Sequence, residues 1–213
     1  MNRHYLLYNS YIEKHTHLWF SKVNIIYCLQ EKIIMQPITS IENLIECFDD
    51  AEPSEQVSVL KRTNISVSDF EKYASWINGE YSRNCIARRD SFEMILICWD
   101  EDAKTPIHDH GGQHCWVLQV SGTITEKRFE QNDGSFTLED EAVLNAGSLS
   151  YMNDKMGYHT LENNSKSQAM TLHIYANPID QCNVFNEEKS EFEIKEMVYD
   201  TMHKMELSTA SKK

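Results

Sequence analysis

The spacing of hydrophobic and polar positions divides the chain into a short helical part and a longer strand-rich part. Residues 39–48 place apolar side chains at helical intervals, and residues 54–61 and 66–79 continue this pattern. We therefore predict two or three short helices, the last of which should end at Gly79, a residue type that favours helix termination. We assign their apolar positions to packing against the rest of the fold.

From Tyr81 onward the pattern changes to short segments that are separated by glycines and other turn residues. Eight strands are expected, at 84–88, 93–99, 114–120, 123–129, 135–143, 148–152, 158–162 and 169–176. Strands at intervals of about 8–12 residues are typical of an all-β barrel or sandwich. Asp133-Gly134 is a strong hairpin signal between two of them. We therefore predict a mainly β fold, with one more element and a tail in the charged segment 187–213.

The length of 213 residues suits one domain, which can bury a full core without disulfides. We predict a single domain over residues 35–200 and a disordered tail over residues 201–213. Residues 1–34 are rich in Tyr, His, Asn and Ile but have no clear period, so we expect an extension outside the core fold. A helix that packs on the barrel is an almost equal alternative for this segment.

The charge and cysteine content exclude several classes of protein. The net charge of −13 makes the chain a poor candidate for binding nucleic acid or an anionic membrane. Its six cysteines form no C-x-x-C pair, so we expect reduced thiols in a cytoplasmic protein rather than a disulfide framework. No run resembles a signal peptide or a membrane span. We expect a monomer.

Three histidines in the strand-rich part are candidates for metal ligands. His108 and His110 are two residues apart, and in an extended segment such a pair points to the same side. His159 lies on a later predicted strand, where a barrel could bring it beside them. A lone histidine is most often an ordinary surface or core residue, but a pair with a third histidine in a β-barrel pattern favours a metal site.

Two motifs around these histidines carry a resemblance to a known superfamily. His108-Asp-His110, followed by Cys115 and Gly122, is similar to the first cupin motif, in which an acidic residue usually takes the place of Cys115. His159-Thr-Leu-Glu-Asn163 is similar to the end of the second cupin motif. The resemblance implies a cupin-type small β-barrel, or jelly roll, behind two or three short helices.

Other segments narrow the resemblance to one family. They are Tyr81-Ser-Arg83-Asn84, Ile95-Leu-Ile-Cys-Trp99, His114-Cys115 and Leu172-His173-Ile174-Tyr175. Together with the histidine pair they resemble cysteine dioxygenase over roughly Ile38 to Phe185. The resemblance implies a non-haem Fe(II) enzyme that adds both atoms of O2 to the thiol of L-cysteine and yields cysteine sulfinic acid. His108, His110 and His159 would hold the iron.

The physical chemistry of these residues agrees with the resemblance. Most non-haem oxygenases use two histidines and one carboxylate, whereas three neutral imidazoles leave the full charge of the metal for an anionic substrate. A thiolate is such an anion, and metal coordination lowers the pKa of a thiol. Arg83 offers a planar, two-pronged match to the substrate carboxylate, and Tyr81 could add a hydrogen bond at the same end. Related enzymes that act on 3-mercaptopropionate have glutamine in place of this arginine, so Arg83 favours cysteine.

Thr171, His173 and Tyr175 alternate with apolar residues and form one polar face of a predicted strand. Such a face most often points to solvent, but the family resemblance implies that it lies inside and orients the Tyr175 hydroxyl toward substrate and oxygen. His173 would then support the site rather than bind the metal. The resemblance also implies that Cys115 and Tyr175 can form a thioether cross-link. A small buried core residue is the ordinary alternative for Cys115.

Three alternatives stay open at this point. The first is a thiol dioxygenase that acts on 3-mercaptopropionate or another small thiol. The second is a non-catalytic cupin that binds a metal and a small ligand. The third is a zinc cupin with a hydrolytic or isomerising activity, for which the sequence supplies no general base because Cys115 replaces the usual acid.

Overall fold

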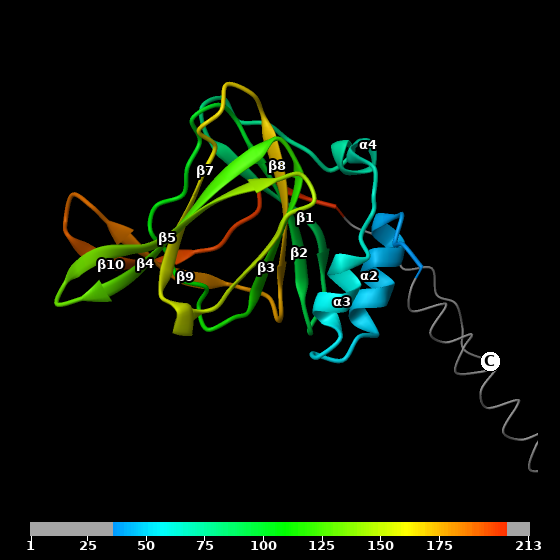
Figure 1. The fold of residues 1–213 in the computed structure, drawn as a ribbon, viewed down its shortest axis with the longest axis horizontal. Helices are drawn as coiled ribbons and strands as arrows, with labels where there is room; N and C mark the ends of the chain where they lie inside the picture. The colour runs from blue at the N-terminus through cyan, green and yellow to red at the C-terminus, as the bar shows by residue number, and fades with distance from the viewer. Residues whose placement is uncertain (1–35, 204–213) are drawn as a thin grey trace, which may run out of the picture.

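The computed structural model describes residues 36–203, in which three short helices precede a strand-rich body (Figure 1). The helices are α2 (Ile41–Asp49), α3 (Gln56–Lys61) and α4 (Val67–Glu71). The side chain of Ser40 caps α2 by accepting a hydrogen bond from the Asn43 amide at 3.1 Å. None of the helices within residues 36–203 is long and apolar enough to cross a membrane.

The third helix ends earlier than the sequence predicts. It stops at Glu71 instead of continuing to Gly79. Ser75 instead forms hydrogen bonds with the first strand, β1 (Tyr81–Arg88). Its hydroxyl donates to the Asn84 side chain at 2.6 Å, and its carbonyl accepts a hydrogen bond from the Ser82 hydroxyl. Tyr73 and Ala74 still donate to the carbonyls of Phe70 and Glu71, and the helix is not continued beyond them, where Ser75 is bonded to the first strand.

Eleven strands form three sheets within the described residues. They are β1 (Tyr81–Arg88), β2 (Glu93–Trp99), β3 (Cys115–Ser121), β4 (Thr123–Asn132), β5 (Ser135–Asn145), β6 (Leu149–Met152), β7 (Tyr158–Glu162), β8 (Ala169–Tyr175), β9 (Gln181–Asn186), β10 (Glu191–Glu196) and β11 (Thr201–Met202). One sheet has the order β11-β1-β2-β8-β3-β6, a second has the order β5-β4-β7, and β9 and β10 form a hairpin. The mainly β fold behind short helices is therefore confirmed.

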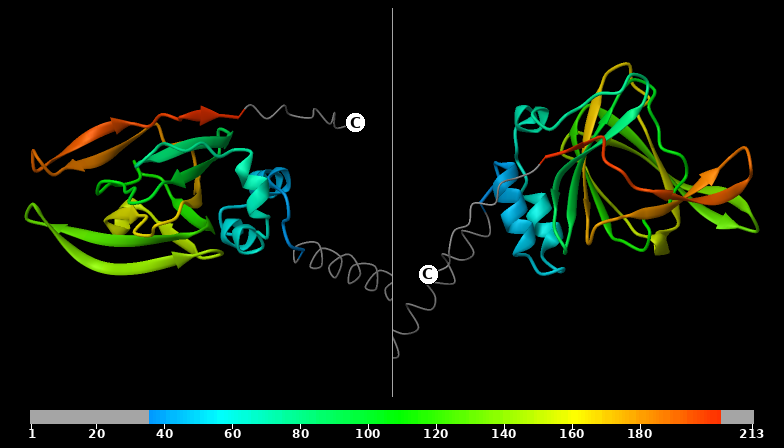
Figure 2. Two further views of the ribbon diagram at one scale, coloured as in Figure 1. Left: turned by 90° about the horizontal axis from the view of Figure 1, so that it is seen from above. Right: turned by 180° about the vertical axis from the view of Figure 1, so that it is seen from behind.

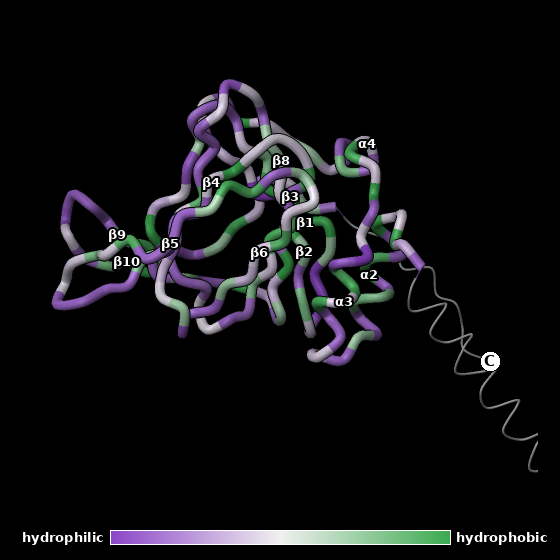
Figure 3. The backbone as a smooth tube through the Cα atoms, viewed as in Figure 1, coloured by the Kyte–Doolittle hydropathy of each residue, from purple (hydrophilic) through white to green (hydrophobic). Residues whose placement is uncertain are grey.

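The six-stranded sheet is buried on both faces, since every residue of β2 and β8 is buried. Met94 and Leu96 belong to an outer cluster together with α2 and α3, whereas Ile95 and Ile97 belong to an inner cluster between the sheets. Figure 2 shows the layers edge-on, with the helices at one end of the strand body. Figure 3 shows apolar positions gathered where these layers meet and hydrophilic positions toward the tips of the long hairpins.

The predicted hairpin at Asp133-Gly134 is confirmed. It joins β4 to β5, and its two central residues have φ values of +50° and +82°, as a tight turn with left-handed backbone requires. The strand β9 was not among the predicted strands, which end at residue 176, and the segment 187–213 holds two strands, β10 and β11, where one element is predicted. The prediction for residues 1–34 lies outside the described residues, as does most of that for 201–213.

Candidate active site

The three predicted metal ligands converge between the sheets. His108, His110 and His159 each offer a ring nitrogen, and these nitrogens all lie within 4.8 Å of one another. The backbones of His108 and His159 form a two-way bridge, with both N–H···O distances at 3.1 Å. His108 also forms a bridge with Val184, so it links the three-stranded sheet to the β9–β10 hairpin. Barrel closure thus brings together residues that lie about fifty positions apart in the chain.

Each histidine is positioned by a separate group, two of them through the ring and one through the backbone. Nδ1 of His108 lies 3.0 Å from the Pro106 carbonyl, and Nδ1 of His159 lies 2.9 Å from Oε1 of Glu126. These contacts leave the Nε2 atoms of both rings free for a metal, since an outer hydrogen bond fixes the tautomer of a metal-binding histidine. His110 is positioned through its backbone amide, which donates to Asp154 at 2.8 Å.

The loop that carries the histidine pair is clamped on both sides. Asp154 also accepts a hydrogen bond from the Gly112 amide at 2.6 Å. Asp109, between the two histidines, points away from them and accepts two hydrogen bonds from Asn183 of β9, at 2.8 and 2.6 Å. The intervening acidic residue therefore fixes the loop to the hairpin, and the two histidines face inward.

The electrostatic surroundings keep the His108 and His110 imidazoles neutral. Burial lowers the pKa of His108 to about 3, and the neighbouring His159 and Arg83 add to this. Burial and the two other ligand histidines also lower the pKa of His110 well below its ordinary value. Burial opposes ionisation of Glu126, but the hydrogen bonds from His159 and Ser150 and the charge of Arg128 outweigh it, and the pKa falls to about 2. Neutral His108 and His110 rings, together with a His159 ring that is held by a carboxylate, suit a divalent metal such as iron or zinc.

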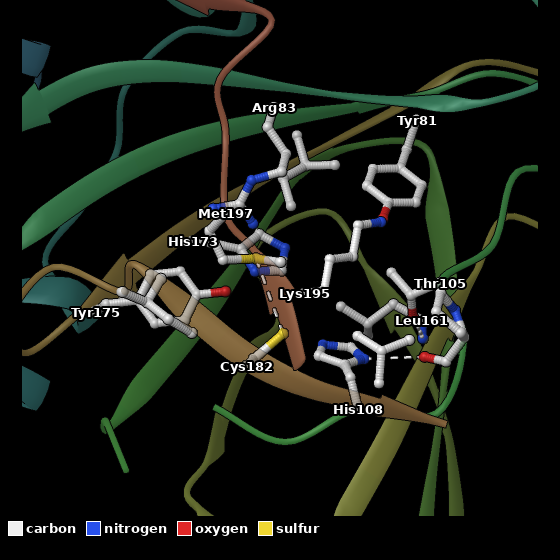
Figure 4. A pocket seen from close by; sticks show the side chains of 14 residues that line it. Tyr81, Arg83, Thr105, His108, Leu161, His173, Tyr175, Cys182, Lys195 and Met197 are labelled. Carbon is white, nitrogen blue, oxygen red and sulfur yellow. Dashed lines mark hydrogen bonds between the residues drawn. The ribbon is translucent and has the colours of Figure 1, made fainter. Parts of the chain in front are cut away.

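A pocket opens beside the histidines (Figure 4). It is lined by Tyr81, Arg83, Ile97, Thr105, Pro106, His108, Leu161, His173, Tyr175, Ile179, Cys182, Val184, Lys195 and Met197. The structure thus brings Arg83, Tyr81, His173 and Tyr175 to one cavity with a metal ligand, as the sequence predicts. None of the residues that line it is an aspartate or glutamate, so its charged groups are cations.

Arg83 is held so that part of its guanidinium remains free. Nε donates to the Val198 carbonyl at 3.1 Å, and the backbone amide of Arg83 donates to Asp200 at 2.7 Å. Nη2 is buried and has no hydrogen-bond partner among residues 36–203. Burial opposes the charge, but Tyr175 and Glu93 outweigh it and raise the pKa of the guanidinium. A buried charged donor without a partner marks a place for an anionic ligand.

The polar row on β8 lies inside the fold. Thr171 and His173 are buried, and Thr171 Oγ1 lies 3.0 Å from Nε2 of His173. The indole of Trp99 donates to the same hydroxyl at 2.8 Å, so Trp99 extends the hydrogen-bonded row. The rings of His173 and Tyr175 are stacked with centroids 6.5 Å apart. This polar face therefore points into the fold, whereas an alternating polar face most often points to solvent.

Cys115 and Tyr175 are directly opposite each other in the β3–β8 pair. Both are buried, and Cys115 is fully enclosed. Burial and the neighbouring Cys115 raise the pKa of Tyr175 well above its ordinary value, so the phenol keeps its proton. Its ring lies 6.2 Å from that of His110, between centroids. The ring of His114 is hydrogen-bonded to the Tyr151 hydroxyl, and His114 is not part of the histidine cluster.

Sequence reasoning missed four groups at this site: Glu126 and Asp154 behind the histidines, and Lys195 and Met197 in the pocket wall. Glu126 could have been found, because it shares one face of a predicted strand with Ile124, which is fully buried. The two pocket residues lie on and just after β10, in the charged segment 187–213, for which one further element without an assigned type or role is predicted.

Comparisons with known proteins agree with this geometry. A sequence model of the family described as Cysteine dioxygenase type I matches residues 29–188. Cysteine dioxygenase type 1 from Danio rerio is 28% identical over 171 residues, which are 75% of this chain and 85% of the relative. The protein of that name from Homo sapiens is 27% identical over 144 residues, covering 65% of this chain and 72% of the relative.

Similar solved structures are more distant. The protein TT1209 from Thermus thermophilus has a TM-score of 0.44 at 18% identity, covering 51% of this chain and 94% of the other. A conserved protein with a double-stranded β-helix domain from Klebsiella pneumoniae has a TM-score of 0.40 at 17% identity, covering 62% of this chain and 96% of the other.

Proposed function

The chain belongs to the cysteine dioxygenase type I family, and from this premise we propose that it is an Fe(II)-dependent dioxygenase of L-cysteine. The reaction adds both atoms of O2 to the thiol and gives cysteine sulfinic acid. One observation carries the proposal: three histidines converge beside a pocket that also holds Arg83 and Tyr175. Three imidazoles that face one point, two of them fixed from behind, fit a resident divalent metal.

Iron held by His108, His110 and His159 would bring the thiol and O2 together and supply the redox chemistry. The chain's own contribution begins with orientation of these ligands. Glu126 and the Pro106 carbonyl hold two of the rings in one tautomer through their Nδ1 atoms. The absence of a carboxylate among the three ligands leaves the metal charge for the substrate sulfur.

Arg83 takes the carboxylate of the substrate in this proposal. Its buried Nη2 has no protein partner within residues 36–203, so a substrate carboxylate would complete its hydrogen bonding. Tyr81 lines the same pocket and adds a phenol donor. A carboxylate partner favours cysteine over cysteamine, which has no carboxylate, and the arginine favours cysteine over 3-mercaptopropionate.

Tyr175 orients the substrate and oxygen through its protonated hydroxyl. Its high pKa keeps it a donor across the physiological range. His173 and Thr171 extend the polar row behind it, and Trp99 fixes the Thr171 hydroxyl. Their place in the fold supports a positioning role for His173 rather than metal binding.

We also propose that Cys115 and Tyr175 become joined by a thioether bond. The carbon–sulfur bond replaces one S–H and one aromatic C–H bond, with O2 as the oxidant. Their opposite positions in the β3–β8 register support this. Peptide mass spectrometry after turnover should find a linked peptide that has lost two hydrogen atoms. Unlinked peptides alone, in a protein with full activity, would contradict the cross-link but not the activity.

Oxygen uptake by the iron-loaded protein tests the function. L-cysteine, 3-mercaptopropionate and cysteamine are compared in parallel, and cysteine should give the highest kcat/KM. No uptake with any thiol would reject the enzyme and favour a non-catalytic metal-binding cupin. Preference for 3-mercaptopropionate would reject the assignment of Arg83 and favour a different small thiol as substrate.

The variant Arg83→Ala tests the carboxylate contact. Loss of a charged hydrogen bond should raise the KM for L-cysteine roughly 10- to 100-fold. Cysteamine, which cannot use this contact, should be turned over as by the parent protein. Arg89→Ala removes an arginine that does not line the pocket and is the matched control. An unchanged KM in Arg83→Ala would remove this residue from the site.

A further inference from the structure

A second cation lines the pocket besides Arg83. Lys195 lies on β10, where it is paired in register with Cys182 of β9. Lys195, Met197 and Cys182 all line the pocket, so this part of the β9–β10 segment forms one of its walls. The sequence around Lys195 is strongly acidic, with Glu191, Glu193 and Glu196 nearby in the chain. Lys195 lines the pocket although acidic residues flank it in the chain, so its position suggests a role in the pocket.

The side chain of Lys195 reaches into the pocket. Figure 4 shows its amine directed toward the hydroxyl end of Tyr81 and well separated from the Arg83 guanidinium. This side chain forms no hydrogen bond or ion pair with any residue in the range 36–203, whereas Lys72, Lys127, Lys166 and Lys189 each pair with a carboxylate. The side chains of Lys61, Lys104 and Lys155 are also unpaired within this range, but only Lys195 lines the pocket.

The charge of Lys195 acts on the thiol of Cys182, which also lines the pocket. Burial raises the pKa of the Cys182 thiol to about 11, and Lys195 opposes that effect. The pocket wall offers no acidic side chain that would neutralise the two cations. The outer groove that Lys195 also lines contains Glu80, Asp102, Glu196 and Asp200, but none of these carboxylates forms an ion pair with Lys195. Within the pocket, one carboxylate on Arg83 would therefore leave Lys195 without an anionic partner.

We propose that Lys195 is a second anion-binding residue of the substrate pocket and extends its specificity to thiols that carry two carboxylates. The first carboxylate binds Arg83 and the second binds Lys195 beside Tyr81. The inference rests on the proposed function only in taking this pocket as the site for a thiol. It concerns binding of the ligand, and it holds whether or not the ligand is then oxidised.

Two matched thiols isolate the contribution of the second carboxylate. Mercaptosuccinate has the skeleton of 3-mercaptopropionate with one carboxylate added next to the sulfur. Their dissociation constants are measured by titration calorimetry on the iron-loaded protein without oxygen, so no turnover occurs. The ratio of the two constants reports the added carboxylate and cancels shared contacts. The parent protein should bind mercaptosuccinate more tightly than 3-mercaptopropionate.

The variant Lys195→Met keeps most of the side-chain length but removes the charge. It should reduce the preference for mercaptosuccinate about fivefold, the effect expected for a partly exposed ion pair, and leave 3-mercaptopropionate within about twofold. Lys195→Arg should retain the preference. Lys104→Met is the matched control, because Lys104 lies with Lys195 along the outer groove but does not line the pocket. It should leave the preference unchanged.

Two results would overturn the proposal: an unchanged preference in Lys195→Met, or an equal loss in Lys195→Met and Lys104→Met, which would show general attraction of anions. Equal unfolding midpoints of the variants and the parent exclude a folding defect, because Lys195 is an exposed residue at a strand edge. Failure of the proposed function has a separate signature. It would appear as no oxygen uptake with any thiol, while the anaerobic binding ratios still report on Lys195.

Discussion

Replacing Glu126 by glutamine tests the support behind the metal ligands. Glu126 is 2% exposed, and its carboxylate receives hydrogen bonds from His159 at 2.9 Å, from Ser150 at 2.6 Å and from Arg128 at 3.1 Å. Glutamine has nearly the same shape but no charge. The substitution therefore removes the electrostatic part of three contacts and leaves the packing in place.

The magnitude follows from the pKa of this group. Its value of about 2 lies well below the ordinary 4.5, and a gap of that size corresponds to roughly 3 kcal/mol of unfolding free energy at neutral pH. Because the pKa is lower in the folded state, this stabilisation is present above the ordinary value and is lost as the pH falls from about 5 toward 2. Glu126→Gln should lack this part of the acid sensitivity.

Two measurements check the prediction. Urea unfolding of the metal-free protein at a series of pH values should show a smaller loss on acidification for Glu126→Gln than for the parent. Competition with a chelator should show about a 10- to 100-fold weaker metal affinity, as for other partners that orient a metal-binding histidine. Glu162→Gln is the control, since Glu162 pairs with Lys127 at 2.8 Å and does not contact the histidines. Equal metal affinity in the two variants would refute the reasoning.

Three further predictions concern the framework of the site. Gly157→Ala should lower the free energy of unfolding by more than about 1–3 kcal/mol, because a Cβ would lie 2.3 Å from a β4 carbonyl at a φ of +91°. In Gly134→Ala the added Cβ has no atom within 4 Å, so the loss of stability should be smaller. Equal losses in urea unfolding would contradict the clash. Thr171→Val should cost about 1–3 kcal/mol by leaving the buried Trp99 indole N–H unpaired, and an unchanged midpoint would count against that bond. Burial raises the pKa of Cys98 to about 11, so iodoacetamide labelling of Cys98 at pH 8, followed by peptide mass spectrometry, should be slow and rise with pH, and rapid labelling at Cys98 in the folded protein would contradict it.

Local patterns were sufficient to predict most elements of the fold. Alternation and turn residues located β1 to β8, and Asp133-Gly134 identified the β4–β5 hairpin. The end of α4 could not be predicted, because Ser75 is recruited by hydrogen bonds from β1 that arise only in the folded protein. In β10, two apolar residues alternate with four charged ones, and the charged residues made this segment difficult to distinguish from a solvated tail. The strand is indeed largely solvent-facing, since even the apolar Ile194 is 68% exposed.

The residues of the candidate site could also be predicted only in part. The spacing of His108 and His110 indicated a metal pair, and Arg83 and Tyr175 were assigned through the family resemblance. Their meeting in one pocket depends on barrel closure, which no local pattern encodes. Lys195 shows this limit most clearly, because only its register opposite Cys182 turns a charged surface position into part of a pocket wall.

The most direct test of the central claim is the fate of oxygen during turnover of L-cysteine. The iron-loaded protein is incubated with L-cysteine under heavy-isotope dioxygen, and the product is examined by mass spectrometry. Cysteine sulfinic acid with both sulfinate oxygens labelled is the predicted result. Sulfinic acid with fewer labelled oxygens, or cystine as the sole oxidised product, would contradict the account.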